Sequence, residues 1–351
     1  MKLWISAAAL IMLCASPVPA QNVLQVPEDY STIQAAVNAA AAGDTIRVGP
    51  GSYSGAFVPK RLTILGEGQP AIECCGIGFL LGSDAVGNAS GTVIQHFDFS
   101  GLNVGILAFS VNDVAVEHNT MLFTAKNSVG INSYGGGSNW TVNHNVISTE
   151  ASNGRGMVNW AGNGWTVSHN NLIGTGLTLG IWFNRILGYL PVERAVNNTA
   201  EFNHIEGAVD GVGIKVTSQD GTVVRNNEIF MPSSSDNPPG VCGGHGIEIH
   251  DSRVILPGQE DDVLTSINSR IINNDTRGTS VGVIVVEDRL GGIGNSAGNV
   301  LRGNFGTFAI HQPDSPPDSP CEGGAITGEL KNRAIQTLIN CDETGLCNDI
   351  P

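Results

Sequence analysis

A repeat of about 25 residues is the feature that most constrains the fold of this chain. Each of seven asparagines follows an aliphatic residue by three positions: Asn119, Asn145, Asn170, Asn203, Asn227, Asn274 and Asn304. Eight glycines open segments of the form Gly-apolar-x-apolar: Gly105, Gly130, Gly156, Gly180, Gly213, Gly246, Gly282 and Gly306. A repeat that cannot bury its apolar face alone stacks on its neighbours, so the pattern predicts a solenoid with one coil per repeat.

The repeat also predicts which side chains form the core. Alternate residues of a β-strand point to opposite sides, and neighbouring strands lie about 4.8 Å apart. The residues that directly follow the glycines are therefore expected to stack inside the coils: Ile131, Met157, Ile181, Ile214, Ile247 and Val283. The asparagines are expected to form a second file at a turn, with each side-chain amide bonded to the next coil. We interpret that file as structural.

Extra residues interrupt the repeat at four places. Three of these insertions fall in the same arc of the coil, at 185–197, 252–265 and 288–298. Insertions in a solenoid form loops, and insertions on one face commonly line a binding site. We therefore expect these three loops to form a wall beside one face of the stack.

The segment ahead of the first coil is predicted to contain a helix over 32–42. Ser31 and Gln34 have the spacing of a capping box. A short amphipathic helix at this point is expected to cap the solenoid, because the apolar end of the first coil needs a cover.

Residues 26–67 carry a resemblance to a known family. They contain Thr32-Ile-Gln-Ala-Ala, Asp44-Thr-Ile and Leu62-Thr-Ile-Leu-Gly66. These segments resemble the opening of right-handed parallel β-helices of the pectin-lyase-like superfamily, and the later coils resemble the generic repeat of those proteins over about residues 23–312. The resemblance implies an all-β fold, a right-handed parallel β-helix solenoid.

The chain is expected to have three parts: a signal peptide at 1–20, the β-helix at 21–312, and a proline-rich linker with a C-terminal cap at 313–351. Lys2, a short apolar run and Val18-Pro19-Ala20 have the order of a secretory signal. The apolar run is too short to span a membrane. We expect a secreted or periplasmic monomer.

Six cysteines remain after the expected signal peptide: Cys74, Cys75, Cys242, Cys321, Cys341 and Cys347. An even number in an exported chain indicates disulfides, and the sequence leaves their connectivity open. Three of the six lie near the C-terminus, which predicts a disulfide-stapled cap with at least one bond inside it. A short helix is expected there over 328–340.

The charge of the chain limits its partners. The formal net charge is −15. Nucleic acids and anionic membranes need a basic footprint, so we expect neither as a partner. An anionic polysaccharide needs a divalent cation to bridge it to such a chain.

The outward face of the glycine strands is expected to carry the functional site. Residues at the second and fourth positions after the glycines combine aromatic rings with polar groups in adjacent coils: Tyr134, Trp160, Trp182, Asn184, Lys215, Glu248 and His250. Flat aromatic faces beside polar groups suit sugar rings. The alternative interpretation is a surface ion pair between Lys215 and Glu248, with Trp182 in a cation–π contact.

Several chemistries remain open for that face. His250 and Glu248 are the acid/base candidates, and Lys215 is a further base for a lyase or epimerase that removes a proton next to a uronate carboxyl. A glycoside hydrolase needs two carboxylates that flank the bond. The non-catalytic alternative is a carbohydrate-binding or surface protein.

A second resemblance concerns two segments. Gly244-His-Gly resembles a motif of the polygalacturonase family, and Asp210 matches one of that family's paired aspartates, whereas Val209 stands at the other. The resemblance implies that His245 and Asp210 bind substrate and leaves the acid/base set incomplete.

Two metal hypotheses follow from the sequence. Asp261 and Asp262 lie in a predicted wall loop and have the oxygen ligands that calcium prefers. His118, His144 and His169 precede ladder asparagines, so they are expected either to bind a metal or simply to stack at a turn. The chain also loosely resembles periplasmic β-helix proteins of metal-site maturation, which keeps that function as an alternative.

Overall fold

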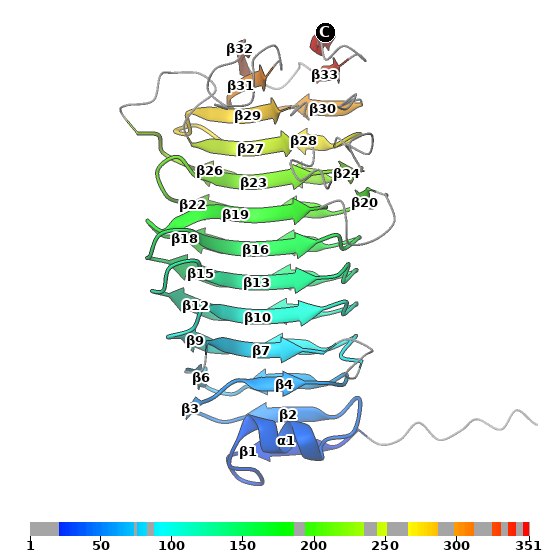
Figure 1. Cartoon of the computed structure of the whole chain (residues 1–351), viewed down its shortest axis with the longest axis vertical. Helices are drawn as coiled ribbons and strands as arrows, with labels where there is room; N and C mark the ends of the chain where they lie inside the picture. The colour runs from blue at the N-terminus through cyan, green and yellow to red at the C-terminus, as the bar shows by residue number, and fades with distance from the viewer. Residues whose placement is uncertain are drawn as a thin grey trace, which may run out of the picture.

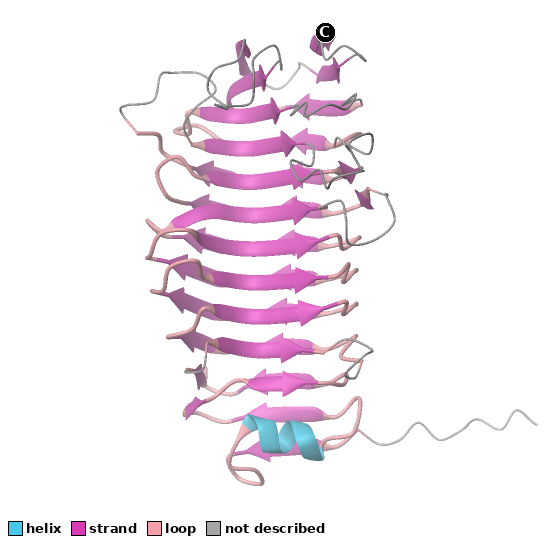
Figure 2. Cartoon of the chain, viewed as in Figure 1, coloured by secondary structure: helices cyan, strands magenta, loops and turns pink. Residues whose placement is uncertain are grey.

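The computed structural model describes residues 21–73, 76–82, 88–185, 194–234, 244–250, 266–286, 298–311, 325–330, 336–341 and 347–350. The strands form stacked parallel sheets around one apolar interior, in the arrangement of a parallel β-helix (Figure 1). Nearly all of the described regular structure is strand, as Figure 2 shows. The repeat therefore predicted the solenoid correctly.

Three long sheets make the walls. The 13-stranded sheet contains, in spatial order, β1 (Val23–Val26), β2 (Thr45–Val48), β5 (Thr63–Gly66), β8 (Val93–Gln95), β11 (Ala115–Glu117), β14 (Thr141–Asn143), β17 (Thr166–Ser168), β21 (Thr199–Glu201), β25 (Val223–Arg225), β28 (Arg270–Ile272), β30 (Asn299–Arg302), β33 (Gln336–Cys341) and β34 (Cys347–Ile350). The 11-stranded sheet contains β32 (Ala325–Leu330), β31 (Gly306–His311), β29 (Val281–Val286), β27 (His245–His250), β23 (Val212–Thr217), β19 (Leu177–Asn184), β16 (Gly154–Trp160), β13 (Val129–Tyr134), β10 (Val104–Phe109), β7 (Ile77–Leu81) and β4 (Ala56–Val58). The 8-stranded sheet contains β26 (Glu228–Phe230), β22 (His204–Glu206), β18 (Asn171–Ile173), β15 (Val146–Thr149), β12 (Thr120–Phe123), β9 (Asp98–Ser100), β6 (Ala71–Ile72) and β3 (Ser52–Tyr53). A small two-stranded sheet pairs β20 (Ala195–Val196) with β24 (Gln219–Asp220).

The predicted core file is confirmed. Ile131, Met157, Ile181, Ile214, Ile247 and Val283 are partners in successive strand pairs, and all are at most 1% exposed. The glycines before them allow the coils to approach closely. A Cβ at Gly130 would lie 2.7 Å from the carbonyl oxygen of Gly156 and 2.8 Å from a methyl group of Ile147.

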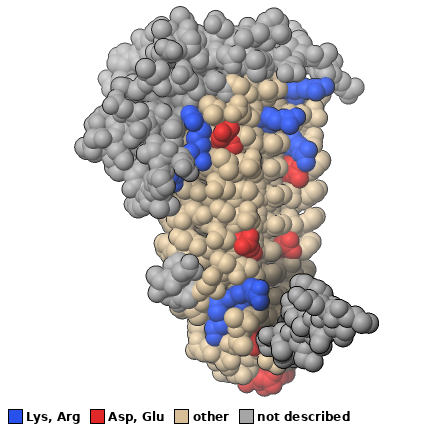
Figure 3. Space-filling model, turned by 90° about the vertical axis from the view of Figure 1, so that its right-hand side faces the viewer, with Lys and Arg blue, Asp and Glu red and all other residues tan. Residues whose placement is uncertain are grey.

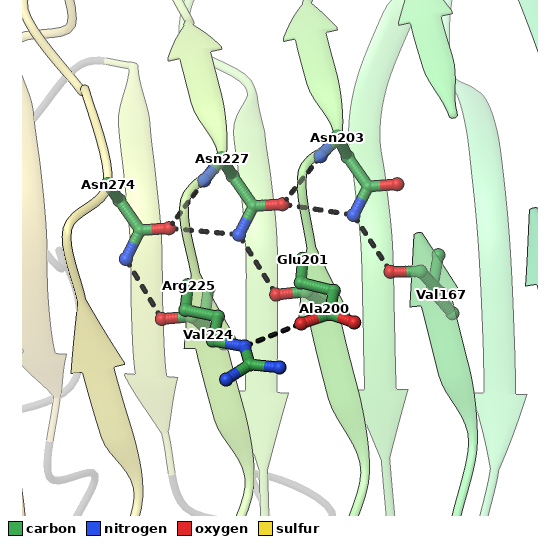
Figure 4. Close-up of polar contacts among 8 residues, drawn as sticks. All are labelled: Val167, Ala200, Glu201, Asn203, Val224, Arg225, Asn227 and Asn274. Atoms are coloured by element: carbon green, nitrogen blue, oxygen red, sulfur yellow. Dashed lines mark hydrogen bonds and ion pairs between the residues drawn. The ribbon is translucent and has the colours of Figure 1, made fainter. Parts of the chain in front are cut away.

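The predicted asparagine ladder is also confirmed, and all seven of its members are buried. From Asn145 onward, each side-chain oxygen accepts hydrogen bonds from the backbone and side-chain nitrogens of the ladder asparagine one coil earlier. The oxygen of Asn119, the first member, accepts from the backbone amide of Phe97. Figure 4 shows this for Asn203, Asn227 and Asn274, where the Nδ2–Oδ1 distances are 2.9 Å. Each Nδ2 also donates to a carbonyl of an earlier coil, such as Val167 or Ala200. The ladder thus satisfies backbone groups that the turn would otherwise leave unpaired.

A second buried polar file, which the repeat did not predict, lies at the corner between the 11-stranded and 13-stranded sheets. Asn159 bonds to Gly162, Asn198 donates to Gln219 at 2.8 Å, and the indoles of Trp140 and Trp165 stack beside them at 4.6 Å. Both indole N–H groups donate to backbone carbonyls at 2.7 Å. The polar members Asn159, Asn198 and Gln219 are 39 and 21 residues apart, so they do not keep the spacing of about 25 residues that predicted the first ladder.

The N-terminal end of the stack carries the helix α1 (Ile33–Ala39), inside the range predicted for it (Figure 1). Its N-cap is Thr32, whose side chain accepts from the amide of Ala35 at 3.1 Å. The predicted capping box is therefore wrong, because the Gln34 amide is used elsewhere. It accepts from Phe57 N at 2.8 Å and donates to Phe57 O at 3.2 Å. Gln34 thus completes the hydrogen bonds of edge strand β4, which has no strand on that side.

The helix expected over 328–340 is wrong. This segment contains β32 and β33, which pair antiparallel with β31 and β30 of the last coil. An open sheet edge offers unpaired N–H and C=O groups that a further strand satisfies, and this tertiary pairing overrides local helix propensity. Within the described residues, no helix is long and apolar enough to cross a membrane.

Candidate functional site

The candidate site lies on the outer face of the 11-stranded sheet, from β10 to β27. Phe109, Tyr134, Trp160 and Asn184 form one file. Phe109 is the direct strand partner of Tyr134, Trp160 is that of Asn184, and the rings of Tyr134 and Trp160 stack. A parallel file contains Trp182, Lys215 and Glu248 on β19, β23 and β27. The structure thus brings the predicted aromatic and polar residues onto one continuous face.

The aromatic rings stack on one another. Phe109 and Tyr134 have centroids 5.6 Å apart at an interplanar angle of 14°, and Tyr134 and Trp160 lie 5.3 Å apart at 17°. Their faces therefore cover each other, and mainly ring edges reach solvent. The flat platform of ring faces that the sequence predicted is not formed by these three residues. Trp182 is tilted by 51° from Trp160, so this indole covers its neighbour less completely.

Trp182 links the aromatic file to the charged residues. Its indole N–H donates to the hydroxyl of Thr217 at 3.0 Å, which fixes the ring against β23. The ammonium group of Lys215 lies 6.0 Å from the centroid of the same ring, at the outer limit of a cation–π contact. The indole therefore forms one side of the environment of Lys215.

Glu248 is the centre of a compact ionic network. One carboxylate oxygen lies 2.6 Å from Lys215 Nζ, and the other lies 2.7 Å from His245 Nδ1. The three side chains are only 18%, 8% and 13% exposed for Lys215, Glu248 and His245. A carboxylate next to Nδ1 favours the tautomer with the proton on Nδ1, so the lone pair of the neutral ring lies on Nε2. We name Lys215, Glu248 and His245 the ionic triad.

Asn184 adds a buried polar group two residues after Trp182 on β19. It lies beside Trp160 in the file, is 1% exposed, and its amide oxygen and nitrogen have no hydrogen-bond partner among the described residues. An unsatisfied buried polar group costs about 1–3 kcal/mol. Such a group commonly marks the position of an ordered water or a bound polar ligand.

The other predicted site residues do not join this network or fall outside the described structure. Asp210 lies at a turn with φ +59°, and its carboxylate accepts from the backbone amide of Ser234 at 3.0 Å, so it caps a turn. The backbone of His250 pairs with Thr217, but its side chain is not described. Asp261, Asp262 and most of the three wall loops also lie outside the described residues.

The histidines at the asparagine turn form a stack that is longer than predicted. His96, His118, His144, His169 and Phe202 follow each other with centroids 4.9–5.2 Å apart and interplanar angles of 3–18°. The lone pair of a ring nitrogen lies in the ring plane, so nearly parallel rings do not converge on an ion that needs bonds of about 2 Å. Among the described residues, no group of three or more His, Cys, Asp or Glu side chains could hold a metal ion. The geometry fits the stacking interpretation.

Charged residues are sparse on the side of the stack that faces the viewer in Figure 3. On the described surface visible there, basic side chains form separate groups toward the two ends, with mainly uncharged residues between them. This described surface shows no continuous basic strip.

Comparisons with known proteins identify the fold. No protein-family model and no curated protein sequence matches this chain. Among solved structures, an alginate lyase from Paenibacillus sp. matches with a TM-score of 0.51 and 14% identity over 79% of this chain and 94% of that one. The catalytic domain of an α-1,3-glucanase matches with a TM-score of 0.43 and 15% identity over 78% and 56%. A surface adhesin of Streptococcus pneumoniae matches with a TM-score of 0.43 and 9% identity over 90% and 92%. At 14% identity, the likeness to the alginate lyase concerns the fold alone.

Proposed function

We propose that this protein binds an extended polysaccharide on the outer face of the 11-stranded sheet. The observation that carries the proposal is the ionic triad beside Trp182, because it gathers an indole, a cation, a carboxylate and an imidazole on three adjacent coils. Sugars offer apolar C–H faces and many hydroxyls, which such a mixed surface recognises. The alginate lyase that shares the fold acts on a polysaccharide, and this agreement supports the proposal.

Proton abstraction from a uronate unit is the chemistry that the triad supports best. The carboxylate of Glu248 holds Nδ1–H of His245, so Nε2 is the atom that takes a proton from the carbon next to the sugar carboxyl. Glu248 stabilises the resulting imidazolium. The positive charge of Lys215 stabilises the negative charge that develops on the substrate. In a lyase the C–O bond to the next sugar then breaks, a C=C bond forms, and the released oxygen takes a proton from the imidazolium or from water. In an epimerase a proton returns to the opposite face of the carbon.

This assignment changes two expected roles. The sequence placed His245 among the substrate-binding residues and His250 among the acid/base candidates, whereas the contact with Glu248 favours His245 as the base. Hydrolysis requires two carboxylates that flank the bond, and Glu248 is the only carboxylate of the described triad. A proton-abstracting enzyme therefore fits the described residues better than a glycoside hydrolase.

Non-catalytic binding is the second candidate, and one observation favours it. Both oxygens of Glu248 are already engaged by Lys215 and His245, which is also the arrangement of a purely structural network. We also propose that the protein is exported. In the non-catalytic case it acts as an exported carbohydrate-binding or surface protein. The periplasmic metal-maturation alternative gains no support from the parallel histidine rings.

A binding screen tests the proposed function. The chain is titrated calorimetrically with neutral and uronic polysaccharides, with and without calcium. Lyase turnover is followed by the ultraviolet absorbance of the new C=C bond, and epimerase turnover by proton NMR of the inverted uronate carbon. We expect binding to at least one extended glycan. Failure to bind any of them would overturn the proposed function, and binding without turnover would select the non-catalytic candidate.

Replacement of Trp160 and Trp182 together by alanine is expected to weaken glycan binding by about 1–3 kcal/mol, the usual cost of truncating aromatic contacts at a hot spot. The matched control is Phe230→Ala, which removes an aromatic ring that is 41% exposed on the 8-stranded sheet. Calorimetry measures the glycan affinity of the wild type, the double variant and the control, and circular dichroism checks that all three are folded. Equal affinities for all three would place the glycan away from these indoles.

A further inference from the structure

The C-terminal end of the stack is closed by antiparallel strands. β33 pairs with β30, the last strand that the coils contribute to the 13-stranded sheet, and β34 pairs with β33. The sheet therefore continues beyond the parallel coils through a hairpin whose two strands are Gln336–Cys341 and Cys347–Ile350. This hairpin covers an edge that would otherwise expose unpaired N–H and C=O groups.

The register of the hairpin places two cysteines opposite each other. Cys341, the last residue of β33, is the direct partner of Cys347, the first residue of β34. Directly opposite residues of an antiparallel pair have Cα atoms about 4.5 or 5.5 Å apart, depending on the hydrogen-bonding position. Disulfides span Cα distances of about 4.4–6.8 Å. The Cα separation expected from this register therefore lies within the range that a disulfide spans.

We infer that Cys341 and Cys347 form a disulfide that locks the C-terminal hairpin. The inference selects one pairing among the connectivities that six cysteines allow and is independent of the carbohydrate site. The bond forms by exchange with a small oxidised disulfide: one cysteine thiolate attacks it and releases a small thiol, and the second cysteine then displaces the other. Both cysteines are oxidised, both sulfurs of the reagent leave as thiols, and one S–S bond joins the strands.

Peptide mapping tests the pairing. The full chain is folded with oxidised and reduced glutathione, and its free thiols are blocked before trypsin is added. Residues 334–351 contain both cysteines and no internal Lys or Arg, so one tryptic peptide carries both. We expect this peptide to lack the blocking group and to be lighter than its reduced form by two hydrogen atoms. Further cleavage after Glu343 is expected to yield two pieces that separate only after reduction.

Two results would overturn the inference: a peptide 334–351 with both thiols blocked, or a peptide linked to the segment of Cys74, Cys75, Cys242 or Cys321. The variant Cys341→Ser provides a second measurement. It is expected to leave one additional reactive thiol, at Cys347, when the folded protein is titrated with a thiol reagent. No increase in reactive thiols over the wild type would also contradict the pairing.

Discussion

Replacement of Asn170 by leucine is expected to lower the free energy of unfolding by about 5 kcal/mol, because several buried polar groups lose their partners at about 1–3 kcal/mol each. Asn170 is 2% exposed, and its side-chain oxygen accepts from both nitrogens of Asn145 at 3.0 Å. Its Nδ2 donates to the carbonyls of Val142 and Ser168 at 2.9 and 3.0 Å. Leucine offers none of these bonds. The loss is comparable to the total stability of many domains.

Urea unfolding followed by circular dichroism measures this effect. The matched control is Asn143→Ala, which lies two residues before Asn145 on the outer side of the 13-stranded sheet and bonds to the side chain of Glu117 at 3.0 Å. The control is expected to change the free energy of unfolding by less than about 1 kcal/mol, as solvent-facing substitutions usually do. If the two variants are equally stable, the ladder does not hold the coils together.

The second large effect concerns His245. On the polysaccharide that the wild type converts, His245→Ala is expected to lower kcat by about 10²–10⁴-fold, the usual contribution of a general base. Affinity is expected to change much less, because the substitution leaves Trp182 and the other indoles in place. The comparison requires kcat and KM from initial rates, together with a direct calorimetric affinity.

His204→Ala is the matched control for this experiment. His204 is also paired with a glutamate, at 3.0 Å from Glu228, but it lies on the 8-stranded sheet. It is expected to keep the wild-type kcat. Loss of turnover in His204→Ala, or full turnover in His245→Ala, would contradict the assignment of His245 as the base.

The sequence predicted the parts of this fold that repeat with one residue type. The asparagines and the aliphatic residues after the glycines recur at nearly constant spacing, so their files could be located by position alone. The second polar file was not predicted because Asn159, Asn198 and Gln219 do not keep a constant spacing along the chain. The bonds of Gln34 to Phe57 were not predicted either, because the two residues are distant in the chain and only the fold brings them together.

The candidate site was predicted in composition but not in geometry. Equal spacing from successive glycines placed Tyr134 and Trp160 on one file, yet spacing carries no information about ring tilt, and the rings stack face to face. The motif that suggested Asp210 identified a segment correctly located before β23, but the carboxylate caps a turn. The importance of His245 emerged from its contact with Glu248, which depends on side-chain direction.

The crystal structure of the chain with an oligosaccharide of the glycan that it binds tests the central claim most directly. We expect the sugar on the outer face of the 11-stranded sheet, in contact with Trp182 and with the triad of Lys215, Glu248 and His245. A sugar carbon next to a carboxyl group is expected within about 3–3.5 Å of Nε2 of His245, the separation of a reactive complex. An oligosaccharide bound to the 8-stranded or 13-stranded sheet, with this face empty, would contradict the account.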